Sequence, residues 1–517
     1  MTGFSEPISV RARPGAAAGR GLLFAEITRI PWVRSIAFAA ASGGLLLLTA
    51  HTLLSGIATQ NLHDWDESRH AVSAYEMSQR GDLLVNTWRG SPDYWNLKPP
   101  LSFWAIMAGY QVFGFTPLGL RAPSAAFTFG TGLLIWAWTT RRFGRAAGVI
   151  ALAAFSSCNL LLNLHSGRTG DPDALFILAM TAGVVAGIEA RSRPRMLVVA
   201  VIAFSLAFLT KSWHAGLLLV FIALLAFTPG LRGRLRGASL LPASLGLLPV
   251  LVWAGLRFRF DGLRFFDGMV QYDLLNRGSN AIEGHTGDGW YYLTLWFEQW
   301  GPWLAVGSAT VCVVLSRSTR VSPHLTHWSD RRLTILALAL WPALVLLAFS
   351  LAGTKLGWYA TPGLPLVCAL TGCSAASSFK GSSALRPVLV LALLLAFVQS
   401  QQLIAGLRHD EPAVAAQVAL TKVPDDGRLH PVFLDPDAAS WTQSMVATAE
   451  MSGGLAPRDG GLQAFEAAAS SSTLPLMLIR RGSSTDKAVD EQPLRFRRIV
   501  QQDDLYLVRL NPKETLP

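Results

Sequence analysis

The sequence predicts an all-α polytopic membrane protein with a small α/β domain at its C-terminal end. Of the 517 residues, 51% are hydrophobic and only 15% are charged, whereas a soluble chain carries about 25% charged residues. Long apolar runs recur from residue 35 to 404, and residues 405–517 are mixed and polar. The net charge is +11, but the basic residues stand in short clusters between apolar runs. They therefore indicate membrane orientation and not a nucleic-acid partner.

Eleven apolar runs are long enough to cross a bilayer of ordinary thickness. A further run, 101–114, is short and is expected either to lie at the interface or to insert, so the count lies between 11 and 13 spans. Residues 1–34 are basic and precede a first helix that we expect to be retained. The predicted spans are 35–57, 120–140, 145–164, 173–190, 195–210, 212–229, 238–257, 301–316, 333–352, 357–377 and 386–404.

The connecting loops are of two kinds that alternate along the chain. One kind is rich in arginine and lysine, as in 141–145 and 317–332, which places it in the cytoplasm together with residues 1–34. The other kind holds nearly all the remaining polar side chains. These loops, 58–120, 164–173, 258–300 and the turns at Lys211 and Lys355, are predicted to share the extracytoplasmic face with 405–517.

The segment 405–517 is expected to fold as a small α/β domain. Its short apolar runs at 431–434, 476–479 and 505–508 predict strands, and the pattern at 459–470 predicts a helix. A stabilising cap and a substrate-docking module both fit this composition. The four cysteines lie in apolar segments, so we expect buried thiols without a disulfide framework.

The first polar loop contains Asp66-Glu67-Ser68-Arg69 and then Lys98-Pro99-Pro100. Asp66 precedes a predicted helix that ends at Arg80-Gly81, so it also suits a helix N-cap. Capping explains neither the second carboxylate nor the arginine beside it. Lys98 either snorkels at a helix entrance or holds a ligand, and the two prolines that fix its backbone favour the second interpretation.

Four further places carry ionisable groups at the ends of predicted spans or in the loops between them. His165, Arg168, Asp171 and Asp173 form a polar cluster before one span. Lys211 lies almost within an apolar run, where a charge is costly and usually functional. Asp173 also suits a helix N-cap. His285 lies in the loop 258–300, and Lys355 and Tyr359 open another span. Several cations and carboxylates set against a bilayer are suited to holding a lipid phosphate while a bond to it breaks.

These motifs, taken in order, resemble the ArnT and protein O-mannosyltransferase-like branch of the GT-C glycosyltransferases. The boxes are Asp66-Glu67-Ser68-Arg69, Lys98-Pro99-Pro100-Leu101, Arg168 with Asp173, Leu209-Thr210-Lys211, His285 before Trp290-Tyr291-Tyr292, and 350–365 with Lys355 and Tyr359. The resemblance covers most of residues 30–380. It implies the GT-C fold and an enzyme of the bacterial inner membrane that moves a sugar from a polyprenyl phosphate, such as undecaprenyl phosphate, on the periplasmic face.

The resemblance also implies roles for individual residues. Asp66, with Glu67 and Asp173, would supply the catalytic carboxylates, and Asp171 could take the place of Asp173. Arg69, Lys98, Lys211 and Lys355 would bind the donor phosphate, and His285, Tyr359, Arg168 and Asp171 would line the pocket. Gly357-Trp358 stands where relatives often have a proline-containing turn.

Other functions stay open on the sequence alone. The acceptor is a lipid such as lipid A, a glycan or a protein. A divalent cation, Mg²⁺ or Mn²⁺, would fit the carboxylates, although lysines can neutralise a phosphate without one. A transporter or flippase of lipid-linked sugars is the competing class, and a catalytically silent relative is a third. The ionisable residues gather at loop edges on one face, whereas a transporter carries them near the bilayer midplane, which favours the enzyme.

Overall fold

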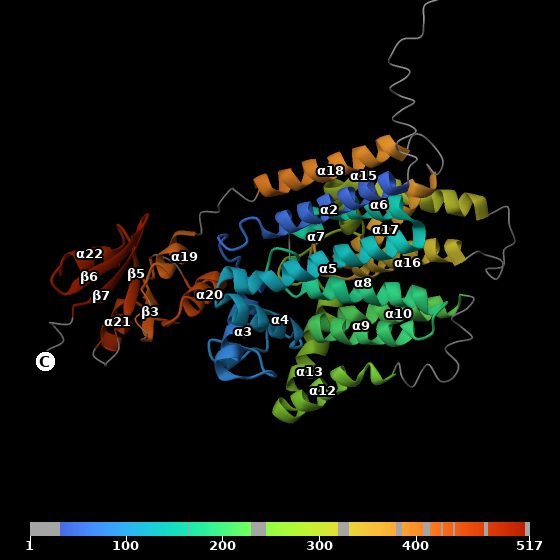
Figure 1. Ribbon diagram of the computed structural model, residues 1–517. Helices are drawn as coiled ribbons and strands as arrows, with labels where there is room; N and C mark the ends of the chain where they lie inside the picture. The colour runs from blue at the N-terminus through green and yellow to red at the C-terminus, as the bar shows by residue number, and fades with distance from the viewer. Residues whose placement is uncertain are drawn as a thin grey trace, which may run out of the picture.

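The computed structural model describes residues 31–511 with several gaps. The gaps are Leu164, residues 425, 427, 438 and 439, and the stretches 229–243, 319–329, 379–384, 407–413 and 470–473. Within the described residues, a large helical bundle is joined to a small α/β unit at one of its ends (Figure 1). The predicted fold class is confirmed.

The bundle consists of long helices that run roughly side by side, with short helices in the connections (Figure 1). The elements in chain order are α2 (Pro31–Leu54), α3 (Asp66–Arg80), β1 (Thr87–Trp88), β2 (Ser91–Pro92), α4 (Leu101–Phe113), α5 (Pro117–Phe143), α6 (Arg145–Ser156), α7 (Asn159–Leu162), α8 (Asp173–Ala190), α9 (Met196–Lys211), η1 (Ser212–Ala215), α10 (Gly216–Ala226), α12 (Leu248–Asp261), α13 (Arg264–Gly268), the π-helical η2 (Met269–Asn276), α14 (Arg277–Ser279), α15 (Tyr291–Ser318), α16 (Asp330–Leu351), η4 (Thr361–Gly363), α17 (Leu364–Ser378) and α18 (Leu385–Gly406).

Each of the eleven predicted spans coincides at least in part with a described helix. By length and composition, five helical stretches among the described residues can cross a membrane: Pro31–Leu54, Asp173–Ala190, Met196–Ala226, Asp330–Leu351 and Leu385–Gly406. The run 145–164 is shorter than predicted, because α6 ends at Ser156 and Cys158 is extended before α7. The run 101–114 is the helix α4. Its Gly109 lies against Gly119 of α5 so closely that a Cβ on Gly109 would stand 2.1 Å from the Gly119 carbonyl oxygen.

The α/β unit follows α18 and contains a five-stranded sheet. Its order is β4-β3-β5-β7-β6, with β3 parallel to β4 and β5, and β7 antiparallel to β5 and β6. The predicted strands and helix correspond to β3, β5, β7 and α21. The elements are α19 (Val414–Thr421), β3 (His430–Leu434), α20 (Gln443–Met451), β4 (Leu455–Pro457), α21 (Leu462–Ala469), β5 (Leu476–Arg480), α22 (Ser484–Asp490), β6 (Phe496–Gln502) and β7 (Leu505–Leu510).

The two predicted kinds of loop lie at opposite ends of the bundle. At one end, Arg142 and Arg191 both pair with Asp330, which joins the ends of α5, α8 and α16. The other end carries α3 and the α/β unit (Figure 1). All five polar loops therefore meet at the end of the bundle that faces the α/β unit.

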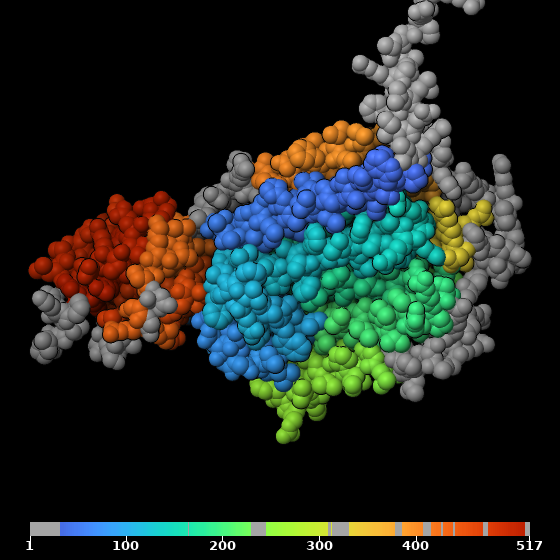
Figure 2. All heavy atoms as spheres, in the orientation of Figure 1, coloured from blue at the N-terminus to red at the C-terminus, as the bar shows by residue number. Residues whose placement is uncertain are grey.

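Helix α20 joins the α/β unit to the bundle by packing on α3. Figure 2 shows the surface of the α/β unit, in orange and red, against the end of the bundle. Val446 and Ala447 of α20 lie in one apolar cluster with Val72 of α3. Glu450, from the same helix, is largely buried there, and its Oε2 has no hydrogen-bond partner among the described residues. Burial, together with the nearby carboxylate of Glu76, raises the pKa of Glu450 to about 8.

We predict that Glu450 makes the docking of α20 sensitive to pH. Because its folded pKa lies above its ordinary value of 4.5, the stability of the folded state is greatest below pH 4.5 and falls as the pH rises through about 8. Glu450→Gln keeps the shape without the charge. It should be more stable than the wild type at pH 9 by a few kcal/mol at most, and nearly equal at pH 5, in thermal unfolding followed by tryptophan fluorescence.

The exposed Glu491 provides the matched control, because Glu491→Gln should change the melting temperature equally at both pH values. An unchanged Glu450→Gln protein at pH 9 would contradict the prediction.

Candidate functional site

Asp66, His165 and Asp171 come together at the polar end of the bundle. His165 Nδ1 lies 3.3 Å from Asp171 Oδ1 and 4.0 Å from Asp66 Oδ2. The imidazole stacks on Trp358, with ring centroids 3.4 Å apart. Asp171 is buried, whereas the side chain of Asp66 is 36% exposed. A carboxylate open to a substrate therefore stands beside a buried imidazole and carboxylate.

The ion pair determines the charge of this group. Burial alone would lower the pKa of His165, but Asp171 and Asp66 outweigh it and raise that pKa to about 9. Burial opposes ionisation of Asp171 as well, but the pairing with His165 holds its pKa well below the usual range. Near neutral pH the pair is thus a cation and an anion, and Asp66 faces the positive side.

Neither Asp66 nor Asp173 acts as a helix cap. The N-cap residues are Trp65 for α3 and Pro172 for α8, and Asp66 and Asp173 are the first residues of these helices. Asp173 instead accepts a hydrogen bond from Lys211 Nζ at 2.5 Å. The sequence left open whether Asp171 or Asp173 is the second carboxylate of the site. In the structure the two residues have different partners, because Asp171 faces His165 and Asp173 pairs with Lys211.

A third group lies beside Tyr359. The Tyr359 ring stands 5.4 Å below Lys211 Nζ, and its hydroxyl accepts a hydrogen bond from Arg277 at 3.3 Å. Tyr359 thus contacts both Lys211 and Arg277.

Lys98 stands at the outer side of the same region. Its ammonium lies 3.7 Å from Asp273 Oδ2, and its side chain stays 20% exposed. Asp273 Oδ1 also lies 3.5 Å from Arg277 Nε. Lys98 and Arg277 thus form a pair of cations around one carboxylate. Arg277 and Asp273 were not singled out from the sequence, because they lie in a polar loop without a recognisable motif.

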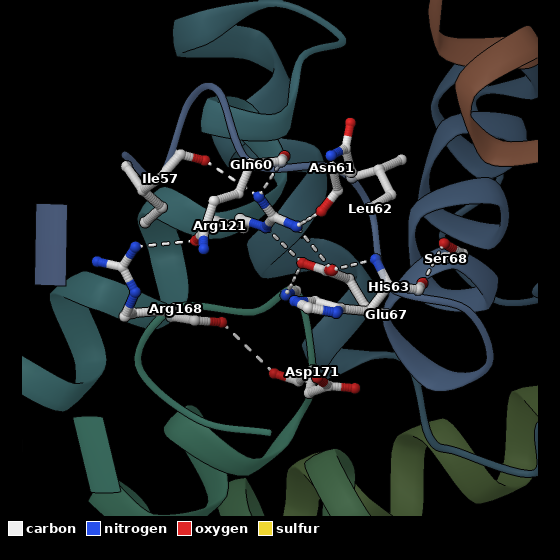
Figure 3. A network of polar contacts seen from close by, with 12 residues as sticks. Ile57, Gln60, Asn61, Leu62, His63, Glu67, Ser68, Arg121, Arg168 and Asp171 are labelled. Atoms are coloured by element: carbon white, nitrogen blue, oxygen red, sulfur yellow. Dashed lines mark hydrogen bonds and ion pairs between the residues drawn. The ribbon is translucent and has the colours of Figure 1, made fainter. Parts of the chain in front are cut away.

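Glu67, the second predicted carboxylate, is buried in a salt bridge with Arg121 of α5 (Figure 3). The bridge is bidentate, at 2.6 and 2.8 Å. The Glu67 carboxylate also accepts the backbone amides of His63 and Gly170, at 2.9 and 3.0 Å. Glu67 therefore ties the loop before Asp66 to the loop that carries Asp171, which indicates a positioning role.

Arg121 completes this network with backbone contacts. Its guanidinium donates to the carbonyls of Ile57, Gln60 and Asn61, which follow α2 (Figure 3). Sequence reasoning missed Arg121, because it stands near the start of an apolar run and its partner is 54 residues away.

Three predicted cations have their charged groups committed to internal contacts. Arg69 makes a bidentate contact with Asp93 between the rings of Trp88 and Trp95. Arg168 donates to the last carbonyls of α2, among them Leu53, and to Gln60. Lys355 Nζ donates to three carbonyls at the end of α16, those of Phe349, Ser350 and Ala352. Arg168 and Lys355 thus cap helix C-termini.

His285 contacts this region through its backbone. Its carbonyl accepts the amide of Lys355 at 3.0 Å.

The α/β unit holds the loop that leads to Asp66. Gln417 of α19 both donates to the carbonyl and accepts the amide of Leu62, each at 3.1 Å. The Ser444 amide at the start of α20 donates to Asp64 at 2.8 Å. Leu62, through its backbone, and Asp64, through its side chain, are therefore anchored from outside the bundle.

Comparison with known families gives a consistent match. Residues 97–254 match the family model described as dolichyl-phosphate-mannose-protein mannosyltransferase. The chain is 29% identical over 347 residues to an undecaprenyl phosphate-alpha-4-amino-4-deoxy-L-arabinose arabinosyl transferase of Pseudomonas fluorescens, covering 63% of this chain and 55% of that protein. The corresponding Pseudomonas aeruginosa protein is also 29% identical, covering 63% and 58%. The chain thus spans little more than half the length of these relatives.

Solved structures match over more of the chain. ArnT from Cupriavidus metallidurans superposes with a TM-score of 0.65 at 17% identity, covering 92% of this chain and all of that one, and a second structure of it is bound to undecaprenyl phosphate. The archaeal oligosaccharyltransferase AglB from Archaeoglobus fulgidus superposes with a TM-score of 0.52. The resemblance to the ArnT-like branch of the GT-C fold, expected from the motifs, is confirmed.

We predict that Glu67→Ala lowers the stability of the fold by about 3–5 kcal/mol, because it leaves the Arg121 guanidinium buried without its counter-charge. Thermal unfolding in detergent, followed by tryptophan fluorescence, measures the loss. Asp490→Ala is the control, because its pair with Arg498 is exposed and such pairs contribute about 0–1 kcal/mol. Equal losses in the two variants would show that the buried pair is not an important support.

Proposed function

We propose that this chain, a membrane-embedded ArnT-like protein of the GT-C fold, is a glycosyltransferase that uses a polyprenyl-phosphate-linked sugar. One observation carries the proposal. The partly exposed Asp66 carboxylate, the His165–Asp171 pair and the cations Lys98 and Arg277 meet at one end of the bundle, where a lipid phosphate and a second substrate can both arrive.

The proposed reaction is a single displacement at the anomeric carbon of the sugar. The bond from that carbon to the phosphate oxygen breaks as a bond to an acceptor oxygen forms on the opposite face, so the configuration inverts. If the acceptor is a hydroxyl, its proton passes to Asp66, because a hydroxyl is a weak nucleophile until a base removes its proton. An acceptor phosphate is already anionic and needs only to be oriented.

The leaving polyprenyl phosphate gains negative charge as the bond breaks. Lys98 and Arg277 are the cations placed to stabilise it, because they share Asp273 and the side chain of Lys98 stays 20% exposed. Such electrostatic stabilisation typically contributes more to the rate than proton transfer does. Lys211 is already paired with Asp173, so it supports the pocket mainly by keeping Tyr359 and Asp173 in place.

The comparisons support the proposed donor, and the charge of the loops supports the proposed orientation. The named relatives and the ligand-bound ArnT structure support undecaprenyl phosphate as the carrier of the donor sugar. We place the site and the α/β unit on the periplasmic face of the inner membrane, since the arginine-rich loops lie at the opposite end. The acceptor is a lipid such as lipid A, a glycan or a protein that reaches that face.

Asp66→Asn should lower sugar transfer by about 10²- to 10⁴-fold, because it removes the proposed base. The assay uses the full chain in proteoliposomes, with undecaprenyl-phosphate-linked 4-amino-4-deoxy-L-arabinose as donor and bacterial envelope glycolipids as acceptors. Asp64→Asn is the matched control, because an amide oxygen can still accept from Ser444. A folded Asp66→Asn protein with full transfer activity would rule out this assignment.

We further propose that a divalent cation binds between Asp66, His165 and Asp171. One ligand atom from each lies within 4.8 Å of the others. His165 Nδ1 and Asp171 Oδ1 are buried, face each other and lack a well-formed hydrogen bond among the described residues. An imidazole among the ligands favours Mn²⁺ over Mg²⁺. The cation would take the place of the His165 proton and supply a Lewis acid next to the donor phosphate.

Binding of Mn²⁺ should raise the melting temperature of the chelator-treated protein, with a stabilisation of about 2.7 kcal/mol at a Mn²⁺ concentration 100 times the Kd. His165→Gln and Asp171→Asn should abolish the increase, whereas His63→Gln should retain it, because the exposed His63 lies outside the three-residue group. Equal increases in all these proteins, or none in the wild type, would contradict a metal at this place.

A further inference from the structure

A cavity of about 370 Å³ lies between α7, α15 and α18, at the end of the bundle that carries Asp66. Most of the side chains that line it carry amides or hydroxyls, and none is ionisable. The lining residues are Ser156, Ser157, Asn159, Leu162, Asn163, Gln299, Gln399, Ser400, Gln402, Leu403 and Gly406. Its volume lies within the about 300–1,000 Å³ of small-ligand sites.

The amides around this cavity are poorly satisfied by the protein itself. Asn159 donates to Gln299 only at 3.5 Å, and Gln399 accepts from Trp303 only at 3.4 Å. The Asn159 Oδ1 atom is buried without a hydrogen-bond partner among the described residues. Unsatisfied polar groups are costly in a helix bundle set in lipid, so the cavity holds either water or a polar ligand.

The lining also restricts the chemistry of such a ligand. Phosphate and other anions are bound by cations, and the lining residues include neither lysine nor arginine. Carboxamides both donate and accept hydrogen bonds, as sugar hydroxyls do. An uncharged, hydroxyl-rich group therefore matches this cavity, unlike the cationic cluster of Lys98 and Arg277.

The position of α18 indicates where the ligand comes from. Only 17% of the most apolar window of α18 is buried, so the helix lies along the outside of the bundle (Figure 2). Large apolar side chains next to the lining residues are exposed, with Phe297 on α15 at 64% and Val398 on α18 at 51%. The cavity thus adjoins an exposed apolar surface near the end of α18, the kind of surface that faces lipid in a membrane protein.

We propose that this cavity binds the uncharged sugar head group of a membrane glycolipid, with Gln399 and Gln402 of α18 and Asn159 of α7 as the main hydrogen-bonding residues. The site is separate from the Asp66 group, and its binding does not depend on sugar transfer.

The test is photolabelling of the full chain in nanodiscs of phosphatidylethanolamine and phosphatidylglycerol. The probe is a monoglucosyl diacylglycerol with a diazirine on the first carbons of one acyl chain, and labelled peptides are mapped by mass spectrometry. We expect labelling within residues 156–163 and 399–406. Gln399→Leu/Gln402→Leu should reduce it at least ten-fold. Gln401→Leu is the matched control, because Gln401 is exposed on the same helix but does not line the cavity.

Two competitors distinguish the sources of the sugar. Unlabelled monoglucosyl diacylglycerol should displace the probe, and free glucose at the same concentration should not. Asn159→Leu, on another helix, should repeat the loss of labelling, and unchanged thermal unfolding shows that each variant is folded. Equal labelling by a phosphatidylglycerol probe, or equal losses in the Gln401→Leu protein, would show a water-filled groove and overturn the proposal. Displacement by free glucose would overturn its membrane source. Because labelling needs no turnover, a protein without transferase activity leaves the test intact.

Discussion

The buried ion pair between Glu67 and Arg121 is the contact on which the geometry of the polar end depends. Two buried charges are costly unless they pair and their remaining hydrogen bonds are filled. Here Glu67 accepts the amides of His63 and Gly170, and Arg121 donates to three carbonyls after α2. The pair thus joins three segments that are far apart in the sequence: residues 57–67, the start of α5 and the loop at Gly170. Apolar side chains in place of both Glu67 and Arg121 could preserve stability. They would not accept the amides of His63 and Gly170, which tie the loop before Asp66 to the loop that carries Asp171.

Around this pair the polar residues divide into supports and exposed groups. Arg168 and Lys355 donate hydrogen bonds to carbonyls at helix ends. Arg69 pairs with Asp93 and packs between two tryptophan rings. Asp66 and Lys98 keep part of their surface open. A shell of buried, paired charges thus holds a few partly exposed ones in fixed positions, and fixed charges of this kind are what electrostatic catalysis requires.

Local patterns in the sequence were enough to predict the helices, the strands of the α/β unit and the end of the bundle at which the polar loops meet. Hydropathy and arginine clusters are visible in short stretches of sequence. The end of the helix 66–80 is visible in the same way, because Gly81 adopts the left-handed conformation that often terminates a helix. The partners of the charges could not be predicted in this way. The acceptors of Lys355 are backbone carbonyls, a group that every residue carries. Arg121 lies in a run that the sequence predicts to be a membrane span. Its partner Glu67 is 54 residues away, so the pairing is visible only in the folded structure.

The same fold brings the loop that carries His165 and Asp171 and the neutral cavity next to one short helix, α7. Asn159 and Asn163 border the cavity, and His165 follows Asn163 by two residues. His165 cannot move far, because Trp358 stacks on its ring and Asp171 faces its Nδ1. The cavity and the Asp66 group are thus neighbours along the chain, and the contacts of His165 with Trp358 and Asp171 hold the group in place next to the cavity.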